Sequence, residues 1–225
     1  MWYTLRLPKV YKTTGLQYKW PLSLCLFIPC VYGADDNEFW TSVSFEKKLP
    51  YSLKLEFEQE LRLLDQLSTF KQTFSELSLS YKVFDGLILQ VPYRYSTYKE
   101  QDKVKQRLSI GGSYKYSFKP VSLKYRARIQ RTFEKKEPSE DMIRNKCTVD
   151  YKMNKSIKPY ISTEIFFPFN EDSVQLDEYR MSFGLTVDIN KKNSMKIFYI
   201  FKKEDLTESD TNVTNIFGLS YSLKL

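Results

Sequence analysis

The sequence contains no histidine, and so lacks the commonest general base and the commonest metal ligand in proteins. It has no run of about 20 apolar residues, which excludes membrane proteins built from helices. Cysteine and glycine are also scarce, with three and seven residues. The chain is instead rich in aromatic side chains, with 16 Phe, 17 Tyr and 3 Trp, and this content excludes a disordered protein.

The first 33 residues are organised like a secretory signal peptide. Residues 1–19 carry four cations and no acid, residues 20–34 carry no charge, and the small residues Val31 and Gly33 precede Ala34. The uncharged stretch is too short to span a bilayer as a helix. We therefore expect residues 1–33 to be removed and residues 34–225 to form one domain; the alternative is a buried core segment.

Removal of this segment changes the charge balance and the cysteine content. Four of the 35 Lys and Arg would leave with it, so that 31 cations would face 27 acids. This small excess argues against nucleic acid as a partner. Cys25 and Cys30 would also leave, and Cys147 alone could form no intrachain disulfide.

The rest of the chain has a repeat of about 35 residues whose internal period is two. Tight turns recur every 34 to 37 residues from Leu49-Pro50 to Lys191-Lys192, and longer polar connections fall between them. In residues 53–63, for example, mainly apolar side chains alternate with charged ones throughout. Such alternation is typical of strands, so each repeat is predicted to be a β-hairpin.

The pattern predicts a closed, all-β, antiparallel up-and-down transmembrane barrel of ten to twelve strands. Strands are expected at 39–49, 52–63, 70–83, 87–98, 104–117, 121–133, 142–153, 157–167, 178–189, 194–203 and 213–225. Eleven residues, rising about 3.3 Å each at a tilt near 45°, climb roughly 26 Å, the height of an outer-membrane apolar band. Short turns would face the periplasm and longer loops the outside. The count of eleven conflicts with the even number that is usual in bacteria.

The membrane prediction also depends on orientation. An open sheet edge would leave amides unpaired in hydrocarbon, so the sheet must close, with apolar side chains toward lipid and charged ones toward the lumen. Aromatic side chains near the strand ends are expected to form two interfacial belts. The belt on the turn side would contain Tyr81, Tyr114, Tyr116, Tyr151 and Tyr221, and the belt on the loop side Tyr93, Tyr95, Phe133, Phe167 and Phe201.

Several segments resemble a family of Gram-negative outer-membrane barrels known only as a domain of unknown function. They are Phe39–Leu49, Leu55–Arg62, Val91–Tyr95 and Lys158–Phe166, and the resemblance extends over residues 39–225. It implies a fold and an outer-membrane location but no activity. The last strand, Phe217–Leu225, resembles the terminal signal read by barrel-assembly machinery, although it ends in Leu rather than Phe.

The candidate site is a cluster of charged side chains in the lumen. Period two places Glu56, Glu58 and Glu60 on one face, with neighbours about 7 Å apart. Paired carboxylates at about 5–9 Å can hydrolyse glycosides, but the favoured interpretation is that these acids neutralise lumen cations. The expected cations are Arg94, Arg126, Arg128 and Arg180.

Two other motifs have more than one interpretation. Arg126 and Arg128 could meet phosphate groups of a solute or of lipopolysaccharide, although a solvated strand face is the commoner explanation. Gly111-Gly112 is followed by no helix and is interpreted as a bend in a curved sheet, not a phosphate loop.

The sequence thus predicts an integral outer-membrane barrel without a catalytic site, with a structural role or one in handling small solutes or lipids. Known membrane-barrel hydrolases and acyltransferases rely on a catalytic histidine, which is missing here. No cofactor or metal is expected. Outer-membrane lipids and the assembly machinery are the expected partners, and the barrel is expected to be monomeric. The alternatives are a secreted lipocalin-like barrel that binds an apolar ligand, and a histidine-free enzyme that uses Glu58.

Overall fold

The computed structural model describes residues 36–64, 69–99, 103–135, 137–170, 173–208 and 210–225. The predicted signal peptide at 1–33 lies outside these residues, so its removal stays a prediction. All regular secondary structure in the described ranges is β-strand. None of these ranges contains a helix long and apolar enough to cross a membrane.

Eleven long strands form the fold, and each begins and ends within three residues of its predicted bounds. They are β1 (Asp36–Lys48), β2 (Leu53–Leu64), β3 (Thr69–Phe84), β4 (Leu87–Tyr98), β5 (Val104–Phe118), β6 (Val121–Glu134), β7 (Glu140–Tyr151), β8 (Ile157–Asn170), β10 (Glu178–Asp188), β11 (Asn193–Glu204) and β12 (Asn212–Lys224). The sequence did not predict β9 (Ser173–Val174), two residues that pair back onto the end of β8. The long strands contain 11 to 16 residues, which suits a bilayer rather than a soluble sandwich.

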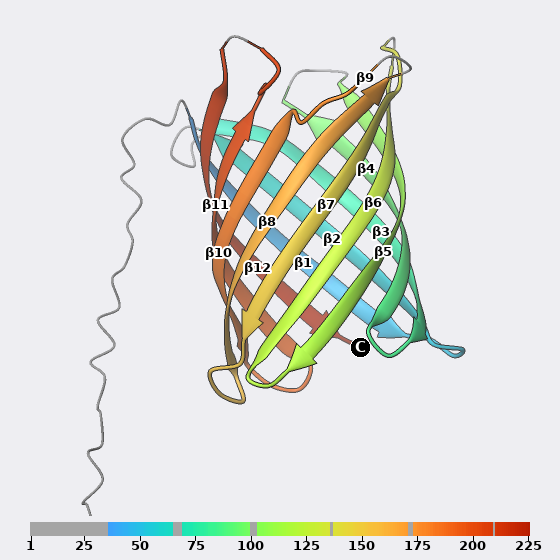
Figure 1. The fold of residues 1–225 in the computed structure, drawn as a ribbon, viewed down its shortest axis with the longest axis vertical. Helices are drawn as coiled ribbons and strands as arrows, with labels where there is room; N and C mark the ends of the chain where they lie inside the picture. Colours follow the sequence, from blue (N-terminus) through green and yellow to red (C-terminus); the bar gives the residue numbers. More distant parts are fainter. Residues whose placement is uncertain (1–35, 65–68, 100–102, 136, 171–172, 209) are drawn as a thin grey trace, which may run out of the picture. The chain divides into compact units, whose positions relative to one another are not determined.

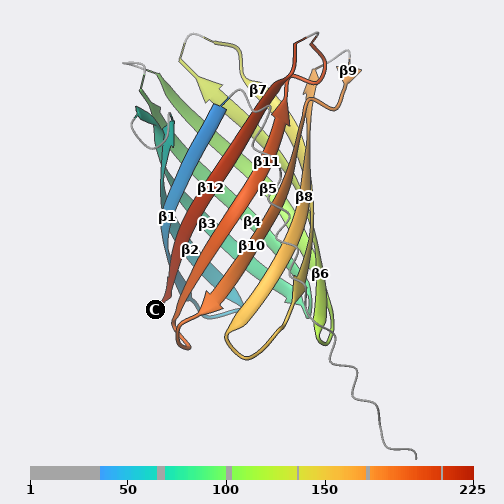
Figure 2. The ribbon, with the colours of Figure 1, turned by 90° about the vertical axis from the view of Figure 1, so that its left-hand side faces the viewer.

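The strands close into a barrel, as predicted (Figure 1). Every neighbouring pair is antiparallel except the closing pair, in which β1 and β12 run parallel over eleven residues, from Asp36 opposite Thr214 to Glu46 opposite Lys224. Figure 2 shows these two strands side by side. Because the strands alternate in direction, the first and the eleventh point the same way, and closure must be parallel. The odd count therefore needs no hidden partner strand.

Connections differ at the two ends of the barrel. The turns at residues 49–52, 85–86, 119–120, 152–156 and 189–192 lie at one end, which we call the turn end, and the longer connections lie at the other, the loop end. Tyr51 and Ser52 both have positive φ, as the hairpin turn of type I′ requires. With an odd number of strands, β1 starts at the loop end and β12 finishes at the turn end. The two described ends of the barrel domain are therefore on opposite sides.

The apolar side chains lie on the outside of the barrel. Leu77 and Ile129 are 48% and 52% exposed, whereas their chain neighbours Ser78 and Arg128 are 8% and 9% exposed because they face the lumen. This alternation is the predicted orientation for a membrane barrel. It does not fit the soluble alternative, in which an apolar ligand would need an apolar interior.

The residues of the predicted aromatic belts lie on this outer face. On the turn side Tyr81, Tyr114, Tyr116 and Tyr151 are exposed, and Tyr221 is half-buried. On the loop side the exposed residues are Tyr93, Tyr95 and Phe133, with Phe167 and Phe201 half-buried. Amphipathic rings at these two levels would meet the two interfaces of a bilayer.

Glycines on the lumen face make room for large side chains beside them. Gly184 is paired with Tyr160, and Gly218 with Phe198. A Cβ on Gly184 would lie 2.4 Å from the Tyr160 ring, and one on Gly218 would lie 2.1 Å from the Phe198 ring. The aromatic rings thus cover the glycine backbone of the neighbouring strand, an arrangement that stabilises glycine within a sheet.

The accessibility of Cys147 provides a test of this orientation. Cys147 is exposed on the outer face of β7, opposite Tyr125 and Thr163 near mid-barrel. We expect a water-soluble maleimide to leave Cys147 unlabelled in lipid vesicles, because lipid covers it, and to label it after unfolding in denaturant. Lys155→Cys in a Cys147→Ser background is the control, since the exposed turn between β7 and β8 should be labelled in both states. Rapid labelling of Cys147 in intact vesicles would contradict the lipid-facing orientation.

Candidate functional site

The predicted charged residues all lie on lumen-facing positions. Glu56, Glu58 and Glu60 follow one another on β2, as the alternation requires. The predicted cations come from three other strands: Arg94 from β4, Arg126 and Arg128 from β6, and Arg180 from β10. The structure separates these residues into two levels of the lumen, and we describe the level nearer the loops first.

A layer of alternating arginine and aromatic side chains crosses the loop-side half of the lumen. We call it the arginine–aromatic layer, and it consists of Trp40, Arg62, Phe74, Arg94, Arg144, Phe166 and Arg180. The Trp40 ring lies between two of these arginines. The guanidinium carbon of Arg62 is 3.6 Å from the ring centroid, and that of Arg180 is 5.5 Å away. Both contacts are cation–π interactions.

The other two rings continue the alternation. The guanidinium carbon of Arg94 lies 3.5 Å from the ring centroid of Phe74. The guanidinium carbons of Arg144 and Arg180 lie 4.5 and 4.6 Å from the ring centroid of Phe166. Phe74 and Phe166 are buried, although they sit on the polar face of their strands. A barrel of eleven strands has a narrow interior, and side chains of this size can fill it.

Each arginine of the layer also has a carboxylate partner. Arg62 pairs with Glu60 at 2.6 Å on its own strand. The remaining pairs are Arg94 with Glu76 at 2.7 Å, Arg144 with Glu164 at 2.9 Å, and Arg180 with Glu178. The four arginine charges of the layer are therefore compensated within the protein, as buried charges generally are.

These partners correct one expectation from the sequence. Glu56, Glu58 and Glu60 were expected to neutralise Arg94, Arg126, Arg128 and Arg180, but no ion pair joins members of these two groups within the described residues. Glu56 pairs with Lys54, and Arg126 pairs with Glu164. The physical reason is the shear of the barrel, because the offset between neighbouring strands decides which side chains meet across the lumen. Alternation along one strand does not reveal this offset.

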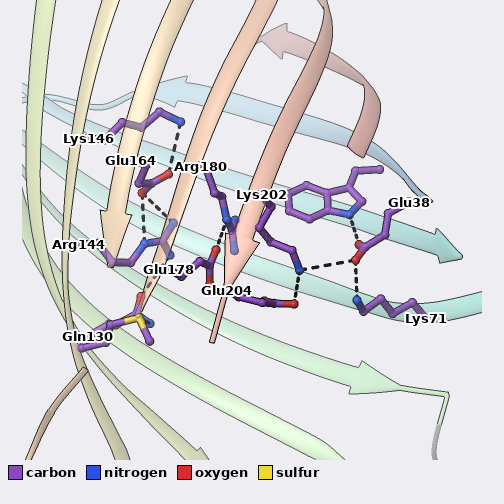
Figure 3. Close-up of polar contacts among 12 residues, drawn as sticks. Glu38, Lys71, Gln130, Arg144, Lys146, Glu164, Glu178, Arg180, Lys202 and Glu204 are labelled. Atoms are coloured by element: carbon purple, nitrogen blue, oxygen red, sulfur yellow. Dashed lines mark hydrogen bonds and ion pairs between the residues drawn. The ribbon is translucent and has the colours of Figure 1, made fainter. Parts of the chain in front are cut away.

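Among the described residues, Glu164 is the lumen carboxylate with the most ion pairs. Its Oε1 lies 2.7 Å from Arg126 and 2.9 Å from Arg144, and its Oε2 lies 3.5 Å from Lys146. Figure 3 shows the contacts with Arg144 and Lys146. The Glu164 side chain is only 5% exposed. One buried anion therefore holds three cations from β6 and β7.

Glu38 on β1 organises a second group of contacts, which includes lysines from β3 and β11. It accepts hydrogen bonds from the indole nitrogen of Trp40 at 2.7 Å and from Lys71 at 2.6 Å. Lys202 approaches Glu38 at 3.8 Å and pairs with Glu204 at 2.8 Å, as Figure 3 shows. These contacts fix the Trp40 ring within the arginine–aromatic layer.

Two cavities lie in the turn-side half of the lumen, with volumes of about 370 and 380 Å³. The first turn-side cavity brings together five of the predicted residues, namely Glu56, Glu58, Arg94, Arg126 and Arg128. The charged residues of the second turn-side cavity are Lys115, Lys124, Arg126, Lys146, Lys196 and Asp150. Lys124 and Arg126 line both, so the two cavities adjoin. Glu60 and Arg180 line neither.

Most of the residues that fill the loop-side half of the lumen could not be predicted from the sequence. Alternation does place Arg62, Glu76, Arg144 and Glu164 on polar faces, but it does not distinguish them from other charged positions. Trp40, Phe74 and Phe166 were the stronger signal, because each is a large aromatic residue on a face that is otherwise polar. The described residues contain no group of three or more His, Cys, Asp or Glu arranged to hold a metal ion.

Fold and lumen together define the class of protein: a closed, porin-like β-barrel with an apolar outer face and a charged lumen. The NanC porin has a similar structure, with a TM-score of 0.54 at 13% sequence identity, covering 81% of this chain and 91% of that one. A bacterial polysaccharide outer-membrane secretin also matches, with a TM-score of 0.49 at 7% identity over 73% of each chain. The KdgM porin matches with a TM-score of 0.45 at 12% identity, over 70% of this chain and 80% of that one.

The chain belongs to the family described as a protein of unknown function, DUF2490, whose sequence profile matches residues 37–213. This result confirms the resemblance found in the sequence. No curated protein matches the chain. The likeness to the porins, at such low identity, establishes the fold alone.

Proposed function

We propose that the protein is a non-enzymatic barrel of the Gram-negative outer membrane that gives small solutes a narrow path. Passage would be restricted at the arginine–aromatic layer. Residues 1–33 would direct export, the turn end would face the periplasm, and the loop end would face outward. The porin-like fold and the apolar outer face support this location.

The observation that carries the proposal is that the lumen has two unlike halves. On the turn side there are cavities of several hundred Å³, large enough for a small solute and its water. On the loop side, buried rings and paired arginines occupy the interior. Wide diffusion pores need about 16 strands, so eleven strands with this filling favour restricted passage.

Single-channel recording in planar bilayers tests this proposal. We expect wild-type conductance to be far below that of an open porin, and Trp40→Ala to raise it several-fold, because loss of the ring frees Arg62 and Arg180 to move aside. Phe133→Ala is the matched control, since it removes an aromatic side chain from the outer face near the loop end. It should leave conductance unchanged.

Two results would contradict the proposal. A wild-type conductance as large as that of an open porin would show that the layer does not restrict the lumen. Silent wild-type and Trp40→Ala barrels, both folded by gel mobility before and after boiling, would remove the solute path and favour a purely structural barrel.

A further inference from the structure

The turn-side half of the lumen carries an excess of positive charge. Nine Lys and Arg line the two turn-side cavities, against five carboxylates. Five of the nine have a carboxylate within 4.0 Å. The other four have none among the described residues, and they are Lys115, Lys124, Arg128 and Lys196. A concave surface with unbalanced charge of one sign concentrates ions of the opposite sign.

Arg128 is the most informative of these four cations. Its side chain lines the first turn-side cavity, the residue is only 9% exposed, and its Nε has no hydrogen-bond partner. A buried guanidinium without a partner is costly, so such a group normally has a bound anion, a carboxylate or ordered water beside it. No carboxylate within 4.0 Å fills that role among the described residues.

Neighbouring residues approach this arginine and one of the lysines closely. Gly111 lies directly opposite Arg128 in the pairing of β5 with β6, and a Cβ there would come within 3.1 Å of the Arg128 Cβ. On the far wall, the Lys196 ammonium lies 4.2 Å from the centroid of the Tyr160 ring. That cation–π contact keeps the lysine in the second turn-side cavity without neutralising its charge.

We infer that the turn-side cavities form a binding site for a small phosphate-bearing solute of about the size of a sugar phosphate. Arg128, Lys124 and Lys196 would supply the charge, and the Arg128 guanidinium would donate to the phosphate oxygens. A dianion fits better than a monoanion because four cations lack a partner. This inference deepens the proposed function, but binding in the cavity does not depend on passage through the layer.

Calorimetric titration of the folded barrel in detergent micelles tests the inference, with glucose 6-phosphate as the probe. At low ionic strength we expect glucose 6-phosphate to bind, glucuronate to bind more weakly and glucose not to bind, with an affinity that falls as salt is added. Arg128→Gln should weaken binding about tenfold or more, because it removes a charged hydrogen-bond donor to the phosphate oxygens. Lys196→Gln repeats the test from another strand.

Lys155→Gln is the matched control, since it removes one positive charge from an exposed turn outside both cavities. It should bind glucose 6-phosphate like the wild type. Equal binding of glucose and glucose 6-phosphate, no binding of either, or equal losses in Arg128→Gln and Lys155→Gln would overturn the inference. If the barrel binds glucose 6-phosphate but shows no conductance in planar bilayers, only the proposed solute path is contradicted. If it conducts but does not bind glucose 6-phosphate, only the proposed binding site is contradicted.

Discussion

Replacing Glu164 with glutamine is expected to destabilise the barrel by about 3 kcal/mol. The carboxylate is almost completely buried and contacts Arg126, Arg144 and Lys146. Removing one partner of a buried ion pair leaves an uncompensated charge, which costs about 3–5 kcal/mol. The lower figure applies here because the turn-side cavities give Arg126 and Lys146 some access to water.

Urea unfolding in phospholipid vesicles would measure this loss. Trp40 is the only tryptophan in residues 34–225, and it is buried in the arginine–aromatic layer, so its fluorescence reports directly on the lumen. Asp141→Asn is the matched control: it also changes a carboxylate into an amide and breaks an arginine pair, with Arg131 at 2.5 Å. That pair is more exposed, so its loss should shift the urea midpoint far less than the loss of Glu164 does.

Similar unfolding midpoints for Glu164→Gln and Asp141→Asn would show that water in the lumen screens Glu164 as effectively as it screens the exposed pair. The three cations would then need no internal counterion. If Glu164→Gln fails to fold, Glu164→Asp can be measured in the same assay instead. Aspartate retains the negative charge on a shorter side chain, so this variant should be more stable than Glu164→Gln and less stable than the wild type.

Substituting alanine at two adjacent glycines is expected to have opposite outcomes. Gly111 faces the lumen, where a Cβ would lie 2.5 Å from the Ala127 carbonyl oxygen and 3.1 Å from the Arg128 Cα. Both are backbone atoms, which cannot move aside as the end of a side chain can. Gly111→Ala should therefore force β5 and β6 apart and destabilise the barrel by about 1–3 kcal/mol, as overpacking generally does.

Gly112 provides the matched control. A Cβ there would meet nothing closer than the Leu89 side chain at 3.5 Å, an ordinary contact. Gly112→Ala should leave the urea midpoint unchanged or raise it slightly, because alanine loses less backbone entropy on folding. Equal effects of the two substitutions would show that β5 and β6 are free to shift, and the close approach at Gly111 would lose its significance.

The two adjacent glycines of β5 have different surroundings. Both residues lie inside β5, as the sequence indicated, and no helix follows them. Only the pairing of Gly111 with Arg128 shows that β6 leaves no room for a side chain at Gly111. Gly111 thus allows β5 to approach Arg128, the central residue of the proposed phosphate site, closely.

The amino-acid sequence by itself determined the strands, the faces and the class of fold. Alternation with period two is a local property, so strand bounds and the sorting of Leu77 outward and Ser78 inward could be predicted without any tertiary contact. The tight turns at Pro50 and Gly86 are equally local signals. Strand length then distinguished a bilayer-spanning barrel from a soluble one.

Only the tertiary structure decided how the barrel closes and which charges meet. The parallel pairing of β1 with β12 joins residues about 180 positions apart, and the shear of the closed sheet brings Glu164 to Arg126 while leaving Arg128 without a carboxylate. Alternation shows which face a side chain occupies but not its height or its partner across the lumen. Those depend on the register of all eleven strands at once, because each strand is offset relative to the one before it.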